Sequence, residues 1–373
     1  MAHAYTPGLR VAEHTTVRRE RRLPLKGEVL VQVGQAVTAQ TIVARTLLPG
    51  NVQTVNLANA LGVEAGEVQG RLLKPLGSEV EAGEVIAQTK ALFGLMKSDA
   101  KSPAKGVLES VSAVTGQLIL REPPIPVEID AYLDGIVVEV LPEEGVIVET
   151  PAAFIQGIFG VGGETHGPLV IAATGPDDEL TADRLNPGMK GKIVVGGAYV
   201  NHAVFKEAIR LGVKAVVVGG FDDRDLRELL GYDLGVAITG QESFGATLLL
   251  TEGFGRIRMS ERTFTLLKKL EGREAALSGA TQIRAGVMRP EIVVPYAKDS
   301  MGAVVEPAVV GMDVGSLLRC IRGDHFGKIG RITALPAPLQ ELGSESHARV
   351  LEAELDGVGR VLLPRANVEL IEA

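Results

Sequence analysis

Several apolar runs in the second half of the sequence end in glycines, with hydroxyl and carboxylate side chains close by. Backbone N–H groups of glycine-rich turns can bind anions, whereas carboxylate and hydroxyl oxygens suit a metal ion or a hydroxyl-bearing ligand. Acidic residues dominate these run ends, which favours the second kind of ligand over bare phosphate. The candidate ligand-binding residues are Gly196, Gly197, Gly219, Gly220, Thr239, Thr251 and Glu252.

The residues at the ends of these apolar runs can also have a purely structural role. Gly-Gly pairs are ordinary turn residues, and Asp or Asn after a strand often caps the next helix. The polar residues open to both interpretations are Asn201, His202, Asp222, Asp223, Gln241 and Glu242.

Two arginines downstream extend this candidate site. Arg284 and Arg289 lie among small residues in the segment 279–292, a setting from which a guanidinium could reach a carboxylate or phosphate ligand. Alternatively, each could pair with Glu252 or Glu291 and tie the segment back onto the sheet. The residue types leave both a ligand-binding and a structural role open.

The sequence predicts no catalytic residue, no metal site and no cofactor. It contains no Ser-His-Asp order, no HExxH run and no Gly-Lys-Ser/Thr phosphate-binding loop. Glu164 and His166 are close in sequence, but such a pair alone is a poor metal signature. Cys320 is the only cysteine, so no internal disulfide can form. Whether the chain is an enzyme stays open, with a non-enzymatic role favoured.

Alternating strand and helix patterns are expected to position the candidate ligand site. The predicted strands are 192–195, 214–218, 234–239 and 246–251, and helical spacing follows several of them. Strand-helix alternation predicts a parallel sheet with right-handed crossovers, and continuous Val and Ile runs fit strands buried on both faces. Such sheets bind ligands at the carboxyl ends of their strands. We therefore expect a three-layer α/β domain over residues 166–295.

One loop pattern occurs twice in the first half of the chain. Residues 33–44 and 76–87 both fit Gly-x-x-Val-x-Ala-x-x-apolar-apolar-Ala. We expect Gly34 and Gly77 to occupy equivalent turns with positive φ, and the two copies to form one compact all-β unit. Between them, Asn56–Gly62 has the pattern of a short capped helix.

The repeat, with the later turn-Gly-apolar segments at 102–111 and 131–140, resembles the barrel-sandwich hybrid of biotinyl and lipoyl domains. The resemblance covers about residues 22–150 and implies a fold that serves as carrier, adaptor or scaffold. Met96-Lys97 is similar to the modified lysine motif of biotinyl domains. Ser98 replaces the second methionine, and the gap from the lysine to the proline is shorter, so we expect Lys97 to be unmodified.

The tail contains a second resemblance. Residues 317–332, with Gly323, Gly327 and Gly330, are similar to the KOW motif of NusG-like elongation factors and certain ribosomal proteins. The resemblance implies an SH3-like barrel over residues 313–373, completed by a hairpin with an Asp356-Gly357 turn. It also implies binding of RNA or protein. The candidate partner-binding or nucleic-acid-binding residues are Arg319, Arg322, Lys328 and Arg331.

Composition narrows the choice of partner. The formal charge of −8 argues against a general nucleic-acid coat, and the tail itself is rich in glutamate. A protein partner is therefore favoured, with RNA as the second candidate and a homo-oligomer left open. The cluster Arg18–Arg22 could hold a phosphate or an acidic partner, or keep a strand edge from pairing. No signal peptide or membrane span is predicted, so we expect a soluble cytoplasmic protein.

The sequence thus predicts a multidomain protein of α/β and all-β parts. The expected divisions are an arm at 1–21, a barrel-sandwich hybrid at 22–165, an α/β domain at 166–295, a linker at 296–312 and a barrel at 313–373. The expected function is a non-enzymatic adaptor or assembly protein, linked to transcription or translation machinery. The alternative is a small-ligand-binding protein or enzyme with its site at the glycine-ended strands.

Overall fold

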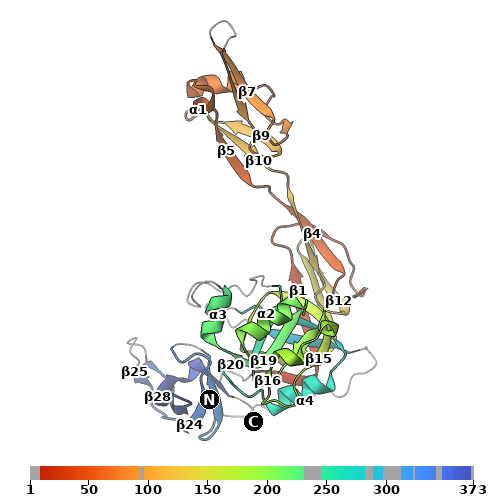
Figure 1. The fold of residues 1–373 in the computed structure, drawn as a ribbon, viewed down its shortest axis with the longest axis vertical. Coiled ribbons are helices and arrows are strands. Elements are labelled where there is room, and N and C mark those ends of the chain that lie inside the picture. Colours follow the sequence, from red (N-terminus) through yellow and green to blue (C-terminus); the bar gives the residue numbers. More distant parts are fainter. Residues whose placement is uncertain are drawn as a thin grey trace.

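The computed structural model describes residues 9–91, 96–230, 245–281, 289–296, 312–321, 324–341 and 347–370. The chain is mostly β and has three parts, which Figure 1 shows. The body comprises strand β1 and residues 145–296, the arm comprises residues 23–144, and the C-terminal unit comprises residues 312–370. The arm projects away from the body, and the C-terminal unit packs beside the body (Figure 1). Within the described ranges, no helix has the length and apolar character needed to cross a membrane.

The body is built on a mixed sheet that, among the described residues, has 13 strands, of which 11 belong to the body and two to the arm. Its strands are β1 (Val11–Arg22), β13 (Gly145–Gln156), β14 (Phe159–Val161), β15 (Glu164–Ile171), β16 (Glu179–Leu180), β17 (Ile193–Val195), β18 (Tyr199–Val200), β19 (Ala215–Phe221), β20 (Thr247–Phe254), β21 (Glu274–Ser278) and β22 (Glu291–Pro295). Its helices are α2 (His202–Arg210), α3 (Asp223–Leu230) and α4 (Glu261–Lys269), with short 3₁₀ turns η3 (Ala182–Arg184) and η4 (Pro187–Met189).

The parallel strands predicted from the sequence are present. Strands β15, β17, β19 and β20 pair in parallel as neighbours, with Val216 opposite both Val194 and Leu248. The strand expected at 234–239 lies outside the described residues. The sheet continues through antiparallel β21, β22 and β13, so the division expected at residue 165 falls inside β15.

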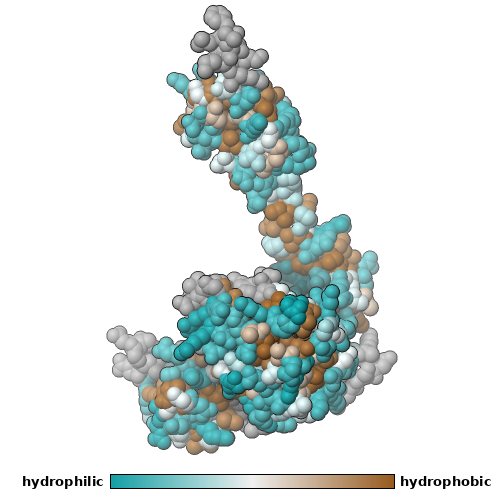
Figure 2. Space-filling view, viewed as in Figure 1, coloured by the Kyte–Doolittle hydropathy of each residue, from teal (hydrophilic) through white to brown (hydrophobic). Residues whose placement is uncertain are grey.

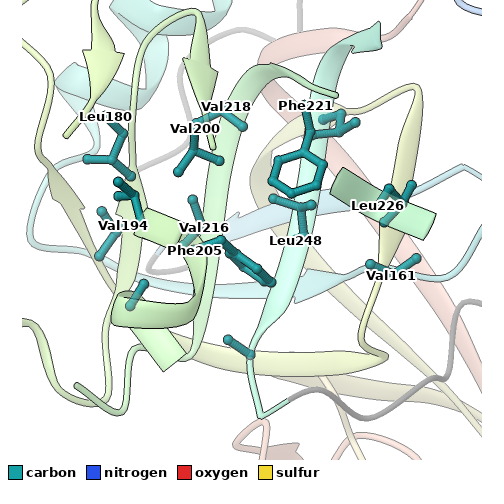
Figure 3. Close-up of a cluster of buried hydrophobic side chains, with 14 of the residues drawn as sticks. Val161, Leu180, Val194, Val200, Phe205, Val216, Val218, Phe221, Leu226 and Leu248 are labelled. Carbon is teal, nitrogen blue, oxygen red and sulfur yellow. The ribbon is translucent and has the colours of Figure 1, made fainter. Parts of the chain in front are cut away.

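Two hydrophobic clusters cover the two faces of this sheet. Alternate residues of one strand enter different clusters, because successive side chains of a strand point to opposite faces. Val216 packs with Phe205 of α2 and Leu226 of α3 in one cluster (Figure 3). Val217 packs with the apolar face of α4 in the other. The helices begin at the predicted caps, since Asn201 and Ser260 accept hydrogen bonds from the first turns of α2 and α4.

The arm consists of two small β units joined by a neck. Its strands are β2 (Glu28–Val29), β3 (Ala36–Val37), β4 (Ile42–Leu48), β5 (Val52–Asn56), β6 (Glu79–Val80), β7 (Val85–Ala91), β8 (Met96–Lys101), β9 (Gly106–Val111), β10 (Gln117–Arg121), β11 (Ile125–Asp130) and β12 (Gly135–Leu141). Helix α1 (Leu57–Leu61), with the predicted Asn56 cap, and turn η1 (Ala65–Arg71) complete it. We call residues 23–46 and 127–144 the proximal unit, residues 53–121 the distal unit, and residues 47–52 and 122–126 the neck.

The two copies of the repeat have the same local structure, as predicted. Gly34 and Gly77 both have positive φ, at 86° and 88°. The Gly34 N–H donates to the carbonyl of Val137, and the Gly77 N–H donates to that of Leu108, each over 2.7 Å. Strand β12 therefore provides the hydrogen-bond acceptor for the glycine turn of the first copy, and β9 provides it for that of the second.

The expectation that the two copies form one compact unit is wrong. The second copy lies in the distal unit, which is inserted between β4 and β11 of the first copy. The distal unit has its own buried cluster around Ile86, whereas the buried residues of the proximal unit around Val43 form one cluster with residues of β1, β13, β21 and β22 of the body. Figure 1 shows the distal unit standing apart at the far end of the arm. Lys97 lies on β8 opposite Lys90, and its side chain is outside the described residues.

The C-terminal unit contains a five-stranded sheet with its own apolar cluster. The predicted hairpin is present, with Asp356-Gly357 turning between β27 and β28. The strands of the unit are β23 (Leu317–Cys320), β24 (Ile329–Ala334), β25 (Gln340–Glu341), β26 (His347–Ala348), β27 (Val350–Leu355), β28 (Gly359–Pro364) and β29 (Val368–Leu370), with turn η6 (Arg365–Asn367).

Candidate functional site

The end of strand β20 is the part of the predicted ligand site where polar groups converge. Thr251 and Glu252 are both buried there. One carboxylate oxygen of Glu252 accepts a hydrogen bond from the Ser260 N–H at 2.9 Å, ahead of helix α4. The other oxygen accepts from Nη2 of Arg319 at 2.7 Å. The carbonyl of Thr251 accepts from Nη1 of the same arginine at 3.2 Å.

Arg319 therefore belongs to the interior, which corrects the expectation that it binds a partner or nucleic acid at the surface. It lies on β23 of the C-terminal unit and is 1% exposed. An unpaired buried guanidinium would be costly, and here two carboxylates accompany it. The second is Glu369 of β29, fully buried, with its Oε1 3.4 Å from Nη1 of Arg319.

Arg289 completes a chain of alternating charges. It pairs with Glu369, so the order is Glu252, Arg319, Glu369, Arg289, and the formal charges cancel. The sequence suggested Glu252 or Glu291 as the structural partner of Arg289, and the structure shows Glu369 in that role. This cluster, which we call the charge lock, joins the body to the C-terminal unit.

The charge lock leaves little space for a ligand. A cavity of about 30 Å³ lies beside it, and residues of the charge lock line it together with the polar residues Gln156, Arg262 and Thr263 and the apolar residues Leu9, Val11 and Leu370. That is room for about two water molecules, far below the roughly 300 Å³ at which small-molecule pockets begin. Within the charge lock, Nε of Arg319, Nη1 of Arg289 and both carboxylate oxygens of Glu369 make no hydrogen bond, although each Glu369 oxygen lies within ion-pair distance of an arginine.

The glycine pairs of the predicted site pack against the chain itself. A Cβ at Gly219 or Gly220 would meet the carbonyl oxygen of Ile257 or of Gly255. A Cβ at Gly197 would meet the carbonyl of Asp178, and one at Gly196 would lie 2.8 Å from a methyl group of Val218. Gly197, Gly219 and Gly220 need glycine because a backbone carbonyl approaches each of them closely, and Gly196 is crowded by buried side chains. No ligand is required to explain them.

The remaining predicted residues fall into three groups. Thr239, Arg284 and Arg322 lie outside the described residues, as do Gln241 and Glu242. The polar residues Asn201 and Asp222 accept hydrogen bonds from the first turns of α2 and α3 and act as caps. Lys328 and Arg331 are exposed on the C-terminal unit, where Arg331 donates to the carbonyl of Gly315 at 3.1 Å.

The turn that resembles a KOW motif contacts the body of the same chain. Phe326 contacts Phe254 at the end of β20, with ring centroids 6.0 Å apart, and Phe254 contacts Phe159 at 5.1 Å. A Cβ at Gly253 would lie 2.9 Å from the carbonyl oxygen of Gly327. The turn therefore docks on the strand end of the body, next to the charge lock.

A second polar cluster joins the arm to the body and accounts for the arginine-rich segment of β1. Arg19 makes a two-pronged ion pair with Glu291, and Arg21 pairs with Asp130 and Glu164. The outer arginines also have partners, Glu149 for Arg18 and both Glu20 and Glu144 for Arg22. These arginines are thus paired with acids of their own chain along β1, which pairs with β13 alone within the described part of the chain and so lies at a sheet edge there.

Tyr132 lies at the centre of this second cluster. Its ring is buried beneath the Arg21 guanidinium, and its hydroxyl donates to Glu291 at 3.4 Å. Burial raises the pKa of Tyr132 well above its usual value, and the charges of Glu291 and Glu164 raise it further. Its φ of 62° is unusual for a residue with a side chain. Nothing in the sequence indicated this residue.

Exposed apolar surface is found on the arm. The neck carries Leu47, Val52 and Ile125, all exposed, and Figure 2 shows hydrophobic surface between the distal unit and the rest of the molecule. No protein-family model and no curated protein matches this chain.

Proposed function

We propose that this protein is a non-enzymatic adaptor or assembly protein, which holds partner macromolecules through its β units. One observation carries the proposal: the strand ends where a ligand or substrate would bind are occupied by the chain's own C-terminal unit, through Arg319. A filled strand end supports a structural role for the glycines, Thr251 and Glu252.

The shape of the arm supports the same function. The distal unit has a separate apolar core and stands at the end of a narrow neck (Figure 1). Such a unit is accessible from most directions, whereas an enzyme needs groups that converge on a substrate. The resemblance to barrel-sandwich hybrids is compatible with this role, since that fold also serves adaptors and scaffolds.

The charge of the chain favours a protein as the partner. The C-terminal unit resembles KOW domains, which is why we propose a link to transcription or translation machinery. However, Arg319 is engaged in the charge lock, which leaves Lys328 and Arg331 as the exposed members of the predicted basic set among the described residues. Two exposed cations on a chain of net charge −8 favour a protein partner over RNA.

The proposal can be tested by removing the distal unit. The tagged full chain and a variant in which a short Gly-Ser turn replaces residues 50–123 would be purified from native cells after mild cross-linking. We expect a defined set of proteins to co-purify with the full chain and to be lost from the variant. A matched control is the full chain with Arg331→Ala, which should keep the same set.

The contrary result is equally clear. If both chains capture the same set, the arm does not hold partners. If neither captures a partner and a small molecule raises the melting temperature of the full chain but not of Glu252→Gln, the ligand-binding alternative replaces the adaptor.

A further inference from the structure

A cleft lies where the proximal unit of the arm meets the body, close to β12 and β15 in Figure 1. Its volume is about 190 Å³, about six times that of the cavity beside the charge lock. A cavity of about 150 Å³ can accommodate a benzene molecule. The cleft therefore has room for a small organic ligand, although it is smaller than the pockets that bind drug-sized molecules.

The wall on the arm side is a turn that contacts within the chain hold in place. The Ala39 N–H donates to Oδ1 of Asp134 at 2.7 Å, and the Ala39 carbonyl accepts from the Tyr132 N–H at 3.0 Å. Within the turn, the hydroxyl groups of Thr38 and Thr41 share a hydrogen bond of 3.0 Å. This wall is thus formed without a ligand, and the second carboxylate oxygen of Asp134 stays available to one.

The wall on the body side is formed by strands of the large sheet. His166 of β15 lies opposite Ala276 of β21, and Glu274 is two residues before Ala276 on the same strand. Glu274 and Ala276 therefore point to the same face of the sheet. Ala276 and Ala39 are both buried in the cleft, and their short side chains leave the space between the two walls unfilled.

The polar side chains of the cleft provide negative charge and hydrogen-bond acceptors. Asp134 comes from the arm and Glu274 from the body, so each wall has a carboxylate. Among the described residues that line the cleft there is no lysine or arginine. Within the same part of the chain, the side chains of Gln40, His166 and Glu274 make no hydrogen bond or ion pair. The charge of the two carboxylates is thus not balanced inside the cleft.

These groups favour an organic cation over a metal ion. Within the described ranges, no group of three His, Cys, Asp or Glu side chains could hold a metal ion. An ammonium group has three N–H donors and a full positive charge, which match carboxylate and amide oxygens and a neutral imidazole nitrogen. Ala276 and Pro295 offer apolar surface in the same cleft for a short hydrocarbon chain.

We infer that this cleft binds a small organic cation, which has a primary ammonium group and a short apolar chain. The charges of Asp134 and Glu274 attract the ammonium group, and the apolar chain lies against Ala276 and Pro295. Because the two walls belong to the arm and to the body, the ligand contacts both parts at their junction. This inference goes beyond the proposed function and does not depend on it, since the cleft involves no residue of the distal unit.

Calorimetric titration of the full chain with butylammonium tests the inference, with 1-butanol and butyrate as neutral and anionic probes of similar size. We expect saturable binding of butylammonium in the millimolar range and no binding of the other two probes. Glu274→Gln and Asp134→Asn each remove one charge and keep an acceptor oxygen. Each should weaken the binding about tenfold, as loss of a hydrogen bond to a charged group does.

Glu128→Gln is the matched control. Glu128 is an exposed carboxylate of the proximal unit that does not line the cleft, so its substitution should leave the affinity unchanged. Melting curves of the three variants check that each is folded. The inference would be overturned if butylammonium showed no saturable binding, if 1-butanol bound equally well, or if Glu128→Gln weakened binding as much as Glu274→Gln.

Discussion

The C-terminal unit and the arm are attached to the body in different ways. The C-terminal unit is joined to it through the charge lock, in which Arg319 and Glu369 are almost completely buried. The arm is joined through shared strands, since β13 pairs with β12 of the arm and with β22 of the body. Beyond that shared sheet the arm narrows to a neck with exposed apolar residues.

The difference indicates where binding should be sought. Buried charges need all their partners in place, so the charge lock commits the C-terminal unit to one position. The arm, in contrast, exposes apolar side chains, among them Leu47, Val52 and Ile125 at the neck. Contacts within the chain thus occupy the predicted ligand site at the end of β20, while exposed apolar side chains lie on the arm and on the C-terminal unit.

The largest expected effect comes from breaking the charge lock. Arg319→Ala leaves Glu252 and Glu369 buried with fewer cations, and loss of one member of a buried ion pair costs about 3–5 kcal/mol. Denaturant unfolding of the full chain measures the change. The control is Arg331→Ala, an exposed member of the same predicted basic set, which should change stability by less than about 0.5 kcal/mol. Equal effects of the two substitutions would show that the charge lock is not a stabilising contact.

A smaller effect is expected at the turns of the arm. Gly77 has positive φ with open space around it, so Gly77→Val should cost about 1–3 kcal/mol through backbone strain alone. Because the distal unit has its own core, hydrogen exchange should show the loss there and not in the body. Gly66→Val is the control, since Gly66 also faces open space but lacks a positive φ. Similar costs for both glycines would contradict the assignment of strain to the turn.

The junction of arm and body should respond to alkaline pH. The pKa of Tyr132 is raised on folding, so its contribution to stability is present below the unfolded value of about 10 and is lost as pH rises above it. Tyr132→Phe should lower stability at neutral pH by about 0.5–1.5 kcal/mol through the lost contact with Glu291. It should also make the decline above pH 10 less steep. Unfolding curves across the alkaline range would decide this, and an unchanged pH profile would show that another group is responsible.

The smallest expected effect concerns RNA. With Arg319 in the charge lock, we expect no measurable binding of a short RNA by the full chain at physiological salt. If binding occurs, each phosphate contact should contribute about −0.7 to the slope of log affinity against log salt. Removing Lys328 and Arg331 together should then flatten the slope by about 1.4. Fluorescence anisotropy across a salt series gives the answer, and a steep slope abolished by the double substitution would restore the RNA-binding interpretation.

Local features of this protein could be predicted from sequence because their causes are local. Gly34 and Gly77 adopt positive φ as their pattern indicates, and Asn56, Asn201 and Ser260 cap helices. The parallel pairing of the Val-rich strands also follows from a strand-helix alternation that short windows reveal.

The charge lock could not be predicted in this way. Arg319 and Glu252 are far apart in sequence, and the choice between a buried pair and an exposed stripe depends on how the C-terminal unit docks. Glu369 belonged to a group of glutamates that only suggested an acidic surface. The insertion of one copy of the repeat into the other was equally hidden, since two copies in one sheet and two in separate units share the same local pattern.

The insertion has a consequence for how the chain folds. The proximal unit is discontinuous, because β4 and β11 must meet although the whole distal unit lies between them. Bringing distant segments together costs chain entropy that grows with the length of the intervening loop. The distal unit can form first from nearby contacts, and its ends then emerge side by side, with Val52 paired to Arg121. Folding of the inner copy thereby replaces a long flexible loop with a short rigid one, and it fixes an order in which the outer copy closes second.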